Sequence, residues 1–485
     1  MTEAGIRTGH VDVGIAIPTI TSQFRSLNVI AWYGSAYLIT LTALQPSFGR
    51  VYKLYSAKAT YLVCVAIFEV GSIICAAAPK SAVFIVGRAI AGCGATGLFQ
   101  GALNIVTNTV PLEKRPIYLG IVISVWGISI CIGPVLGGAF TQEVTWRWCF
   151  WINVPIGAVT FVLISIFLKT GIKTKTRQPR SVLNQLIRLD PLGAGTIIAA
   201  IVCLFLALQW GGQTKPWNSS TVIGLFVGAA LLLSVFCFLQ WRMGEDATTP
   251  LRVLRQRSIL FGSLFLFTSA MSAYIYGYYL PIYFQSIKAS SPTKSGLEFM
   301  ALALPQIVFI VVAGAVTTRW GYYVPYSILG TAIQLVRSGL LVTLDADTST
   351  IKWALYMVIT GIGTGIGVNL PYIAVQVVLK EEDVATGNAI GLTIGQTLFL
   401  NKLTSEVGRR TPEVPPAATP RLLRVLRQAY ATAIRSSMIF AVIVVGIALL
   451  FTFGLENLNV KKTAKKRSEE KGVGDGEDGR AAKEG

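Results

Sequence analysis

The sequence predicts an all-α polytopic membrane protein with about 14 transmembrane helices. The chain has 485 residues, of which 53% are hydrophobic and only 13% are charged. Soluble domains carry about 25% charged residues, so most of this chain is too apolar to face water. A spanning helix needs about 20 apolar residues, and runs of that length recur along nearly the whole chain.

Taken in order, twelve apolar runs are long enough to cross a bilayer, and two further runs are stunted. The stunted runs are the first, Val11–Thr21, and the thirteenth, 385–400. The full-length runs cover residues 29–48, 59–78, 82–108, 116–140, 149–168, 191–210, 220–240, 259–284, 296–317, 324–344, 351–379 and 436–455.

Lysine and arginine are distributed unequally between the two sets of loops that fourteen spans create. Seventeen lie in the loops that share a side with the termini, and seven lie opposite, leaving aside the last outer loop. Cytoplasmic loops carry such an excess, so both termini are predicted to be cytoplasmic. The last outer loop, roughly 401–435, is also basic and does not fit this pattern. Residues 461–485 are charged and glycine-rich, and they are expected to form a disordered cytoplasmic tail.

Composition excludes several functional classes. The net charge of +19 comes largely from short loops, and no basic module with interleaved aromatics points to nucleic acid. His10 is the single histidine, and the seven cysteines are scattered without a CxxC pair, which argues against a metal site, a disulfide framework or an intramembrane enzyme. No GxxxxGK[ST] motif is present, so ATP-driven pumping is not predicted. We expect no enzymatic activity and no cofactor.

The stretch Trp126–Phe140 combines an apolar composition with glycines and a proline. Such a helix survives in lipid because neighbouring helices and water satisfy the freed backbone groups. Small residues four apart also let a second helix approach closely. We predict a bent, tightly packed span whose important residues are Ser129, Gly133, Pro134, Gly137 and Gly138.

Ionisable residues within the spans are few, and such residues are functional candidates by default. Arg88 shares a helical stripe with Gly92 and Ala95, so it is expected to face a small-residue surface, although snorkelling from the helix start is the alternative. Glu69 is a second candidate, with a structural hydrogen-bonding role as the alternative. Arg337 is interpreted as structural.

Polar side chains on several spans form a candidate substrate path. An aromatic run in the ninth span adds rings that either stack on a flat ligand or belong to an interfacial belt. The candidates are Gln100, Asn104, Tyr278, Gln306 and Asn369.

Two segments indicate an internal repeat. Gly49–Lys58 follows the second span and Gly314–Tyr323 follows the tenth. Each places a glycine at a helix end and basic or aromatic residues in a tight turn, as expected of a transporter built from two similar bundles.

On these motifs the chain resembles the major facilitator superfamily, specifically its fungal fourteen-span drug:proton antiporter group, from about Ile15 to Lys462. The glycine and proline pattern at 129–138 is similar to the antiporter motif of the fifth span. The resemblance also rests on Trp146–Gly157, Phe68–Ser72, Tyr279–Gln285, and Gly87 and Arg88 with the glycines that follow them.

The resemblance implies a major facilitator fold of two six-helix bundles with two extra spans between them. Residues 1–168 would form the first bundle, 169–258 a cytoplasmic loop and the extra spans, and 259–460 the second bundle. A protein of this group exports hydrophobic toxins, drugs or secondary metabolites by alternating access, driven by inward proton flow. We expect a monomer in the plasma membrane, with the vacuolar membrane as the alternative.

The resemblance also assigns roles to residues. Arg88 matches the arginine implicated in proton coupling, with Glu69 as a second coupling candidate. Gly49, Lys53 and Lys58 match the cytoplasmic gating loop. Two departures stand out: Gly9 occupies the position of a first-span aspartate, and Lys53 replaces the usual loop aspartate. An importer of siderophore-bound iron or nutrients on the same fold, and an inactive paralogue, stay open as alternatives.

Overall fold

The computed structural model describes an all-helical chain. Two isolated bridges, Gly211 with Lys215 and Tyr322 with Asn459, are the only other pairings among the described residues. Those residues are 19–25, 29–168, 190–212, 214–288, 290, 292–345, 348–380, 383–389 and 420–481.

The N-terminal half is held together by close backbone contacts between α4 and its neighbours. A Cβ at Gly94 would lie 2.4 Å from the backbone nitrogen of Phe68, and one at Gly71 would lie 2.3 Å from that of Ala91. Glycine therefore lets α4 and α5 touch along their length. The elements of this half are α2 (Ile30–Ala43), α3 (Gln45–Leu54), α4 (Ala57–Ala77), α5 (Ser81–Thr109), α6 (Arg115–Ala139), the π-helical turn η2 (Phe140–Val144), α7 (Trp148–Trp151) and α8 (Asn153–Phe167).

Two further long helices follow the N-terminal half and pack against each other. They also rest on α2, where Ala43 joins a buried cluster with Ile197, Ile201 and Phe236. These elements are α10 (Pro191–Trp210), α11 (Ser220–Met243), η3 (Gly244–Asp246) and α12 (Leu251–Leu254).

The C-terminal half buries an aromatic core. Phe284 lies edge-on to Trp353, with ring centroids 4.8 Å apart, and both belong to a cluster that includes Tyr276 and Met357. The elements are α13 (Arg257–Ile282), η4 (Tyr283–Ile287), α14 (Pro292–Trp320), α15 (Val324–Val342), α16 (Thr350–Val368), α17 (Leu370–Val378), α20 (Pro420–Thr452) and α21 (Val460–Ala481).

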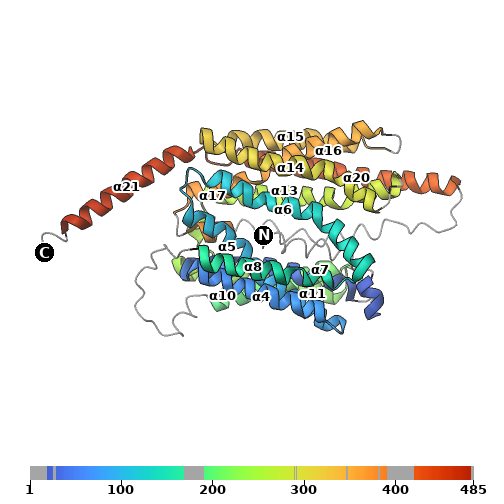
Figure 1. The fold of residues 1–485 in the computed structure, drawn as a ribbon, viewed down its shortest axis with the longest axis horizontal. Coiled ribbons are helices and arrows are strands. Elements are labelled where there is room, and N and C mark those ends of the chain that lie inside the picture. Colours follow the sequence, from blue (N-terminus) through green and yellow to red (C-terminus); the bar gives the residue numbers. More distant parts are fainter. Residues whose placement is uncertain are drawn as a thin grey trace.

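Figure 1 shows the two halves as two layers of roughly parallel helices. One layer contains α4, α5, α8, α10 and α11, and the other contains α13 to α16 and α20. Helix α6 belongs to the N-terminal half in sequence, yet its most extensive contact is with α14. The α6–α14 pair is therefore the main helix contact between the halves.

Helices interrupt where the sequence places proline near a helix start. The predicted span 29–48 is divided at Leu44, before Pro46, into α2 and α3. The predicted span 351–379 is divided at Asn369, before Pro371, into α16 and α17. Proline lacks the backbone N–H of a continuous helix, so each break follows from the local sequence.

Nine helices among the described residues are long and apolar enough to cross a membrane, and each matches a predicted span. The protein is thus a multi-pass membrane protein, whereas the count of fourteen stays a prediction. Most of the stunted run Val11–Thr21 and residues 390–400 of the stunted run 385–400 lie outside the described residues. The nine helices are Ala57–Ala77, Ser81–Thr109, Trp148–Phe167, Pro191–Trp210, Ser220–Met243, Arg257–Gly277, Lys294–Trp320, Thr350–Val378 and Ile434–Thr452.

The C-terminal tail differs from the expectation of disorder, because Val460–Ala481 forms helix α21. The side chain of Asn459 accepts hydrogen bonds from the backbone N–H groups of Lys461 and Lys462, which caps the helix start. Arg467 donates to the carbonyls of Val377 and Leu379 and so fixes the first turns to the end of α17. Capping and a tertiary contact outweigh the polar composition here.

Helix α20 also begins earlier than its predicted span 436–455. It starts at Pro420, within the stretch 401–435 that the sequence predicts as an outer loop. The remainder of that loop, 401–419, lies outside the described residues.

Candidate functional site

One end of the molecule carries an ion cluster that joins the two halves. Asp383, in the helical segment 383–389, accepts from Lys53 of α3 at 2.7 Å and from Arg252 of α12 at 2.7 Å. Arg252 also pairs with Glu245 at 3.0 Å. The side chain of Asp383 is only 4% exposed. Burial would raise its pKa, but Lys53 and Arg252 outweigh burial and hold the pKa of this carboxyl below its usual value.

Close backbone packing accompanies the ion cluster. A Cβ at Gly49 of α3 would lie 2.8 Å from the Cβ of Ala389 and 3.1 Å from the carbonyl oxygen of Ala385. Only glycine allows α3 to approach the segment 383–389 this closely. Arg50, which is buried, donates to the carbonyl of Ala247 at 2.6 Å. The two halves and the linker between them therefore meet at this end.

Of the three predicted gating-loop residues, Gly49 and Lys53 lie at this junction and Lys58 does not. Lys58 donates to the carbonyl of Ser165 at 2.8 Å, in the last turn of α8. A cation at a helix C-terminus is favourable, so Lys58 ties α4 to α8 within the N-terminal half.

Arg88 is buried in the N-terminal half, with 2% of its surface exposed. Its Nε donates to the carbonyl of Tyr33 at 2.9 Å, and its guanidinium lies 4.4 Å from the ring centroid of Tyr37. Gly92 makes this contact with α2 possible, since a Cβ there would lie 2.1 Å from Thr40 Oγ1. The side chain thus contacts Tyr33 and Tyr37 of α2 and is buried, which differs from the snorkelling alternative; the tyrosine contacts were not predicted.

Glu69 lies on a different interface. A Cβ at Gly157 of α8 would come within 1.8 Å of Glu69 Oε1, so the carboxyl fills the space that this glycine leaves. Nearby, Asn153 donates to Ser72 at 3.4 Å. Glu69 Oε2 has no hydrogen-bond partner among the described residues. The two coupling candidates therefore face different neighbours, Arg88 toward α2 and Glu69 toward α8.

Close approach of α6 and α14 involves Gly127, which the sequence interpretation did not single out, and Gly314, which it placed at a helix end but which lies within α14. A Cβ at Gly314 would lie 2.5 Å from the carbonyl oxygen of Pro116. A Cβ at Gly127 would lie 2.5 Å from Ile307 Cγ1. The α6–α14 contact thus depends on Gly127 of α6, upstream of the glycine and proline motif, and on Gly314 of α14.

The motif itself lies at the far end of α6, which continues directly into the π-helical turn η2. Ser129 is buried and donates to the carbonyl of Val125 at 2.9 Å. Gly133 and Gly137 are buried, whereas a Cβ at Gly138 would meet nothing within 4 Å.

Pro134 and Tyr278 occupy helical positions, in α6 and α13, but their side chains are outside the described ones.

The remaining path candidates come from both halves. Gln100 and Asn104 are buried on α5, and Gln306 is half-buried on α14. Both amide atoms of Gln100 have no hydrogen-bond partner among the described residues. Asn369, at the break between α16 and α17, donates to the carbonyl of Pro116 at 3.3 Å. Asn369 therefore links the C-terminal half to α6.

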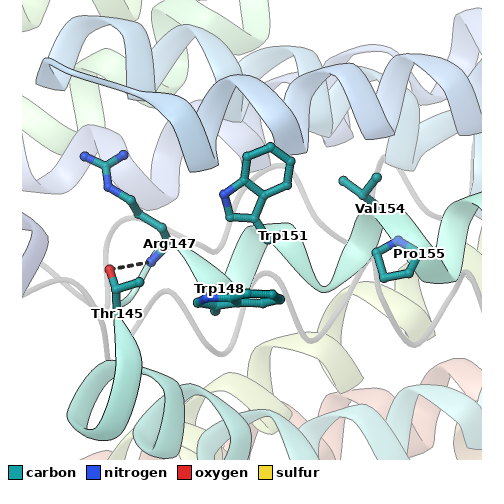
Figure 2. A pocket seen from close by; sticks show the side chains of 6 residues that line it. All are labelled: Thr145, Arg147, Trp148, Trp151, Val154 and Pro155. Atoms are coloured by element: carbon teal, nitrogen blue, oxygen red, sulfur yellow. Dashed lines mark hydrogen bonds between the residues drawn. The ribbon is translucent and has the colours of Figure 1, made fainter.

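A shallow, mainly apolar groove of about 420 Å³ lies at the other end of the N-terminal half (Figure 2). Trp148 and Trp151 remain 47% and 38% exposed along it. Arg147 is held by the carbonyls of Ala76 and Ala78 at 2.7 and 2.9 Å. The groove is lined by Thr145, Arg147, Trp148, Trp151, Val154 and Pro155. It offers aromatic surface to an apolar molecule.

Asp383 and Arg252 were not recognised in the sequence. Lys53 was a signal for Asp383, because it is basic at the position where related loops carry an aspartate. A lysine at that position favours an acidic partner. Arg337 was interpreted as structural, and its contacts agree: its guanidinium lies 4.0 Å from the ring centroid of Tyr276 and donates to Thr364 at 3.2 Å. Within the described ranges, no group of three metal-ligating side chains occurs.

Comparison with known proteins identifies the family. Residues 7–399 match the profile of the Major Facilitator Superfamily. The chain is 41% identical over 473 residues to the MFS-type efflux pump MFS1 of Arthroderma benhamiae, covering 93% of this chain and 88% of that protein. It is 41% identical over 414 residues to the aspyridones efflux protein of Neocamarosporium betae, covering 83% and 73%.

Solved structures agree on the fold. The human organic anion transporter MFSD10 superposes with a TM-score of 0.59 over 92% of this chain and 97% of its own, at 14% identity.

Proposed function

The chain belongs to the Major Facilitator Superfamily, and on that premise we propose that it is a proton-coupled secondary transporter that exports hydrophobic small molecules by alternating access. The observation that carries this proposal is the ion cluster between the halves. It closes one end of the molecule with charges and side-chain contacts that can be broken and re-formed.

Alternating access requires that each end of the path open while the other is closed. At the α3 end, Lys53 and Asp383 come from opposite halves, and Gly49 packs directly against Ala389. Leu103 of α5 joins Ile310 and Leu370 of the C-terminal half in one buried cluster. These contacts support a closed gate at this end. Moving the halves apart would break the ion cluster and expose the cluster of apolar side chains.

We place this gate on the cytoplasmic side. The loops that contain Lys53 and Arg252 belong to the lysine- and arginine-rich set, which favours the cytoplasm. Both termini would then be cytoplasmic, with α21 extending from the same side as the gate. We propose the plasma membrane as the location, because compounds exported there leave the cell.

Arg88 is proposed to act in proton coupling through its fixed positive charge. Arginine stays protonated in proteins, so it cannot carry the transported proton itself. A buried cation instead stabilises an ionised acid or an ordered water at the coupling site. Its contacts with Tyr33 and Tyr37 of α2 hold the charge in place within the membrane.

The proposed substrates are hydrophobic compounds with a few hydrogen-bonding groups. The amide of Gln100 is buried and has no hydrogen-bond partner in the part of the chain that the structure describes, so it offers both a donor and an acceptor inside the N-terminal half. Ligand sites combine apolar walls with a few such groups. The exposed Trp148 and Trp151 offer flat surface near the opposite end. A relative named as an efflux protein for aspyridones fits this class.

Inside-out plasma-membrane vesicles from yeast that express the protein test this function. We expect an imposed acidic interior to drive uptake of rhodamine 6G, and a protonophore to abolish it. Vesicles from the same strain without the protein are the control. Absence of gradient-driven uptake would contradict export, and uptake only into right-side-out vesicles with an acidic exterior would instead indicate an importer.

A further inference from the structure

Asp190 sits at the start of the two extra helices in an unusual conformation. It has a φ of 52°, in the left-handed region, and is fully buried. Its carboxylate accepts from the backbone N–H of Gly193 at 2.8 Å, which caps α10. A buried non-glycine residue in this region is strained, so the surrounding contacts must hold it.

Those contacts reach the linker between the halves. Asp190 accepts from Gln240 Nε2 at 2.7 Å, from Thr248 Oγ1 at 2.8 Å and from the backbone N–H of Thr248 at 3.2 Å. Gln240 in turn accepts from the backbone N–H of Thr249 at 2.7 Å. One carboxylate thus fixes the end of α11 and the linker residues 248 and 249 to the start of α10.

The same linker contacts both halves of the transporter. On one side, Ala247 accepts from Arg50 of α3. On the other side, Arg252 pairs with Asp383, and Val253 is fully buried in a cluster with Val384, the residue next to Asp383. We name residues 244–255 the linker arm.

We infer that the linker arm is a third component of the cytoplasmic gate and that Asp190 is the residue that positions it. The two extra helices then act as an anchor for the gate. Their packing on α2 connects the two extra helices to the N-terminal half. The ion pair of Arg252 with Asp383 connects the linker arm to the C-terminal half. This inference rests on the proposed gating function.

The experiment compares Asp190→Ala with Asp190→Asn and with a matched control, Ser219→Ala. Ser219 caps the opposite end of α11 by accepting from the backbone N–H of Val222 at 3.3 Å. Its loss weakens the same helix pair without touching the linker arm. Asparagine keeps an acceptor for Gly193 but places an NH2 group where Oδ2 accepts from Gln240 and Thr248. It therefore separates the cap of α10 from the contacts that hold the linker arm.

Spin labels at two exposed positions, Arg255 in the linker arm and Lys380 beyond α17, report the position of the arm in a variant in which all seven cysteines are replaced by serine. Double electron–electron resonance is recorded in nanodiscs alongside rhodamine 6G transport. We expect Asp190→Ala to broaden the distance distribution and to lower transport about tenfold. Asp190→Asn should broaden the distribution as well, because its amide cannot accept from Gln240 and Thr248 while it caps α10. Ser219→Ala should keep the narrow distribution and most of the transport.

An unchanged distribution in Asp190→Ala, or equal broadening in Ser219→Ala, would overturn the inference. Broadening in Asp190→Ala with full transport would support the positioning role of Asp190 but would remove the linker arm from the gate. Failure of the proposed function would show instead in the parent protein, as absence of proton-driven rhodamine 6G transport. The two failures are therefore distinguishable.

Discussion

Lys53 and Asp383 lie 330 residues apart in the sequence and form a 2.7 Å ion pair between the two halves of the protein. The side chain of Lys53 is 23% exposed and that of Asp383 is 4% exposed, so Asp383 is more strongly shielded from water than Lys53. Arg252 shares the same carboxylate. This pair is the centre of the proposed closed gate.

A double-mutant cycle on this pair should reveal coupling. We expect Lys53→Gln and Asp383→Asn each to shift the protein away from the closed gate, with an interaction free energy of about 1–2 kcal/mol. The closed fraction, from resonance distances between labels on the two halves, is the measurement. Strictly additive effects of the two substitutions would show that the pair contributes nothing to closure.

The contribution of Asp383 to gate closure should be insensitive to pH near neutrality. Because the pKa of Asp383 in the closed protein lies below its usual value, the stabilisation is complete above the free value, about 3.9. It is lost only as the pH falls through the lower pKa of the closed state. The difference in closed fraction between the parent protein and Asp383→Asn should therefore be constant from about pH 5 to 8. A difference that shrinks on acidification within that range would require another titrating group in the ion cluster.

Replacing Arg88 by lysine should abolish coupled transport even though the charge is kept. Lysine cannot reproduce both the Nε hydrogen bond to Tyr33 and the stacking on Tyr37. We expect proton-driven rhodamine 6G transport to fall about tenfold or more, with the protein still in the membrane. Arg319→Lys, outside the buried core, serves as the comparison. Parent-level transport by Arg88→Lys would remove Arg88 from the coupling mechanism.

An added methyl group should destabilise the protein at Gly314, in the α6–α14 contact, but not at Gly138. Gly314→Ala would place a Cβ 2.5 Å from the carbonyl oxygen of Pro116, whereas Gly138→Ala meets open space. We expect Gly314→Ala to lower the free energy of unfolding by about 1–3 kcal/mol and Gly138→Ala to change it by less than about 0.5 kcal/mol. Thermal denaturation in nanodiscs measures the stability of both variants. Equal stability of Gly314→Ala and Gly138→Ala would be inconsistent with this packing.

Removing the amide of Gln100 should raise the stability of the protein and lower its transport. Its two polar atoms are buried and lack a partner within the described ranges, so Gln100→Leu is expected to raise the free energy of unfolding, by about 1 kcal/mol. Transport should nevertheless fall if the amide binds substrate. A stable variant with unaltered transport would place the substrate path elsewhere.

Local sequence was sufficient for the long helices, whereas the breaks at Leu44 and Asn369 fall inside spans that were predicted to be continuous. Apolar runs predicted the nine long helices, and Pro46 and Pro371 mark two of the interruptions. The burial of Arg88 followed from its small-residue stripe. These features depend on residues within a few turns of one another.

Long-range partners could not be predicted in this way. Spacing gave no indication that Asp383 would meet Lys53, that Asn369 would donate to Pro116, or that Arg467 would fix α21 against Leu379. Each of these contacts depends on how separate helices pack in space. The charge of Lys53, opposite to that of related loops, was the one local hint of an acidic partner.

Reversible cross-linking across the gate shows whether the gate must open during transport. In a protein without its native cysteines, Lys53→Cys and Asp383→Cys place two thiols across the closed gate, because the native side chains meet at 2.7 Å. We expect a bifunctional thiol reagent that a reductant cleaves to link the two positions and stop rhodamine 6G transport. Reduction should restore the transport of the double variant, and neither single variant should respond. Continued transport by the cross-linked protein would contradict the gating role of this junction.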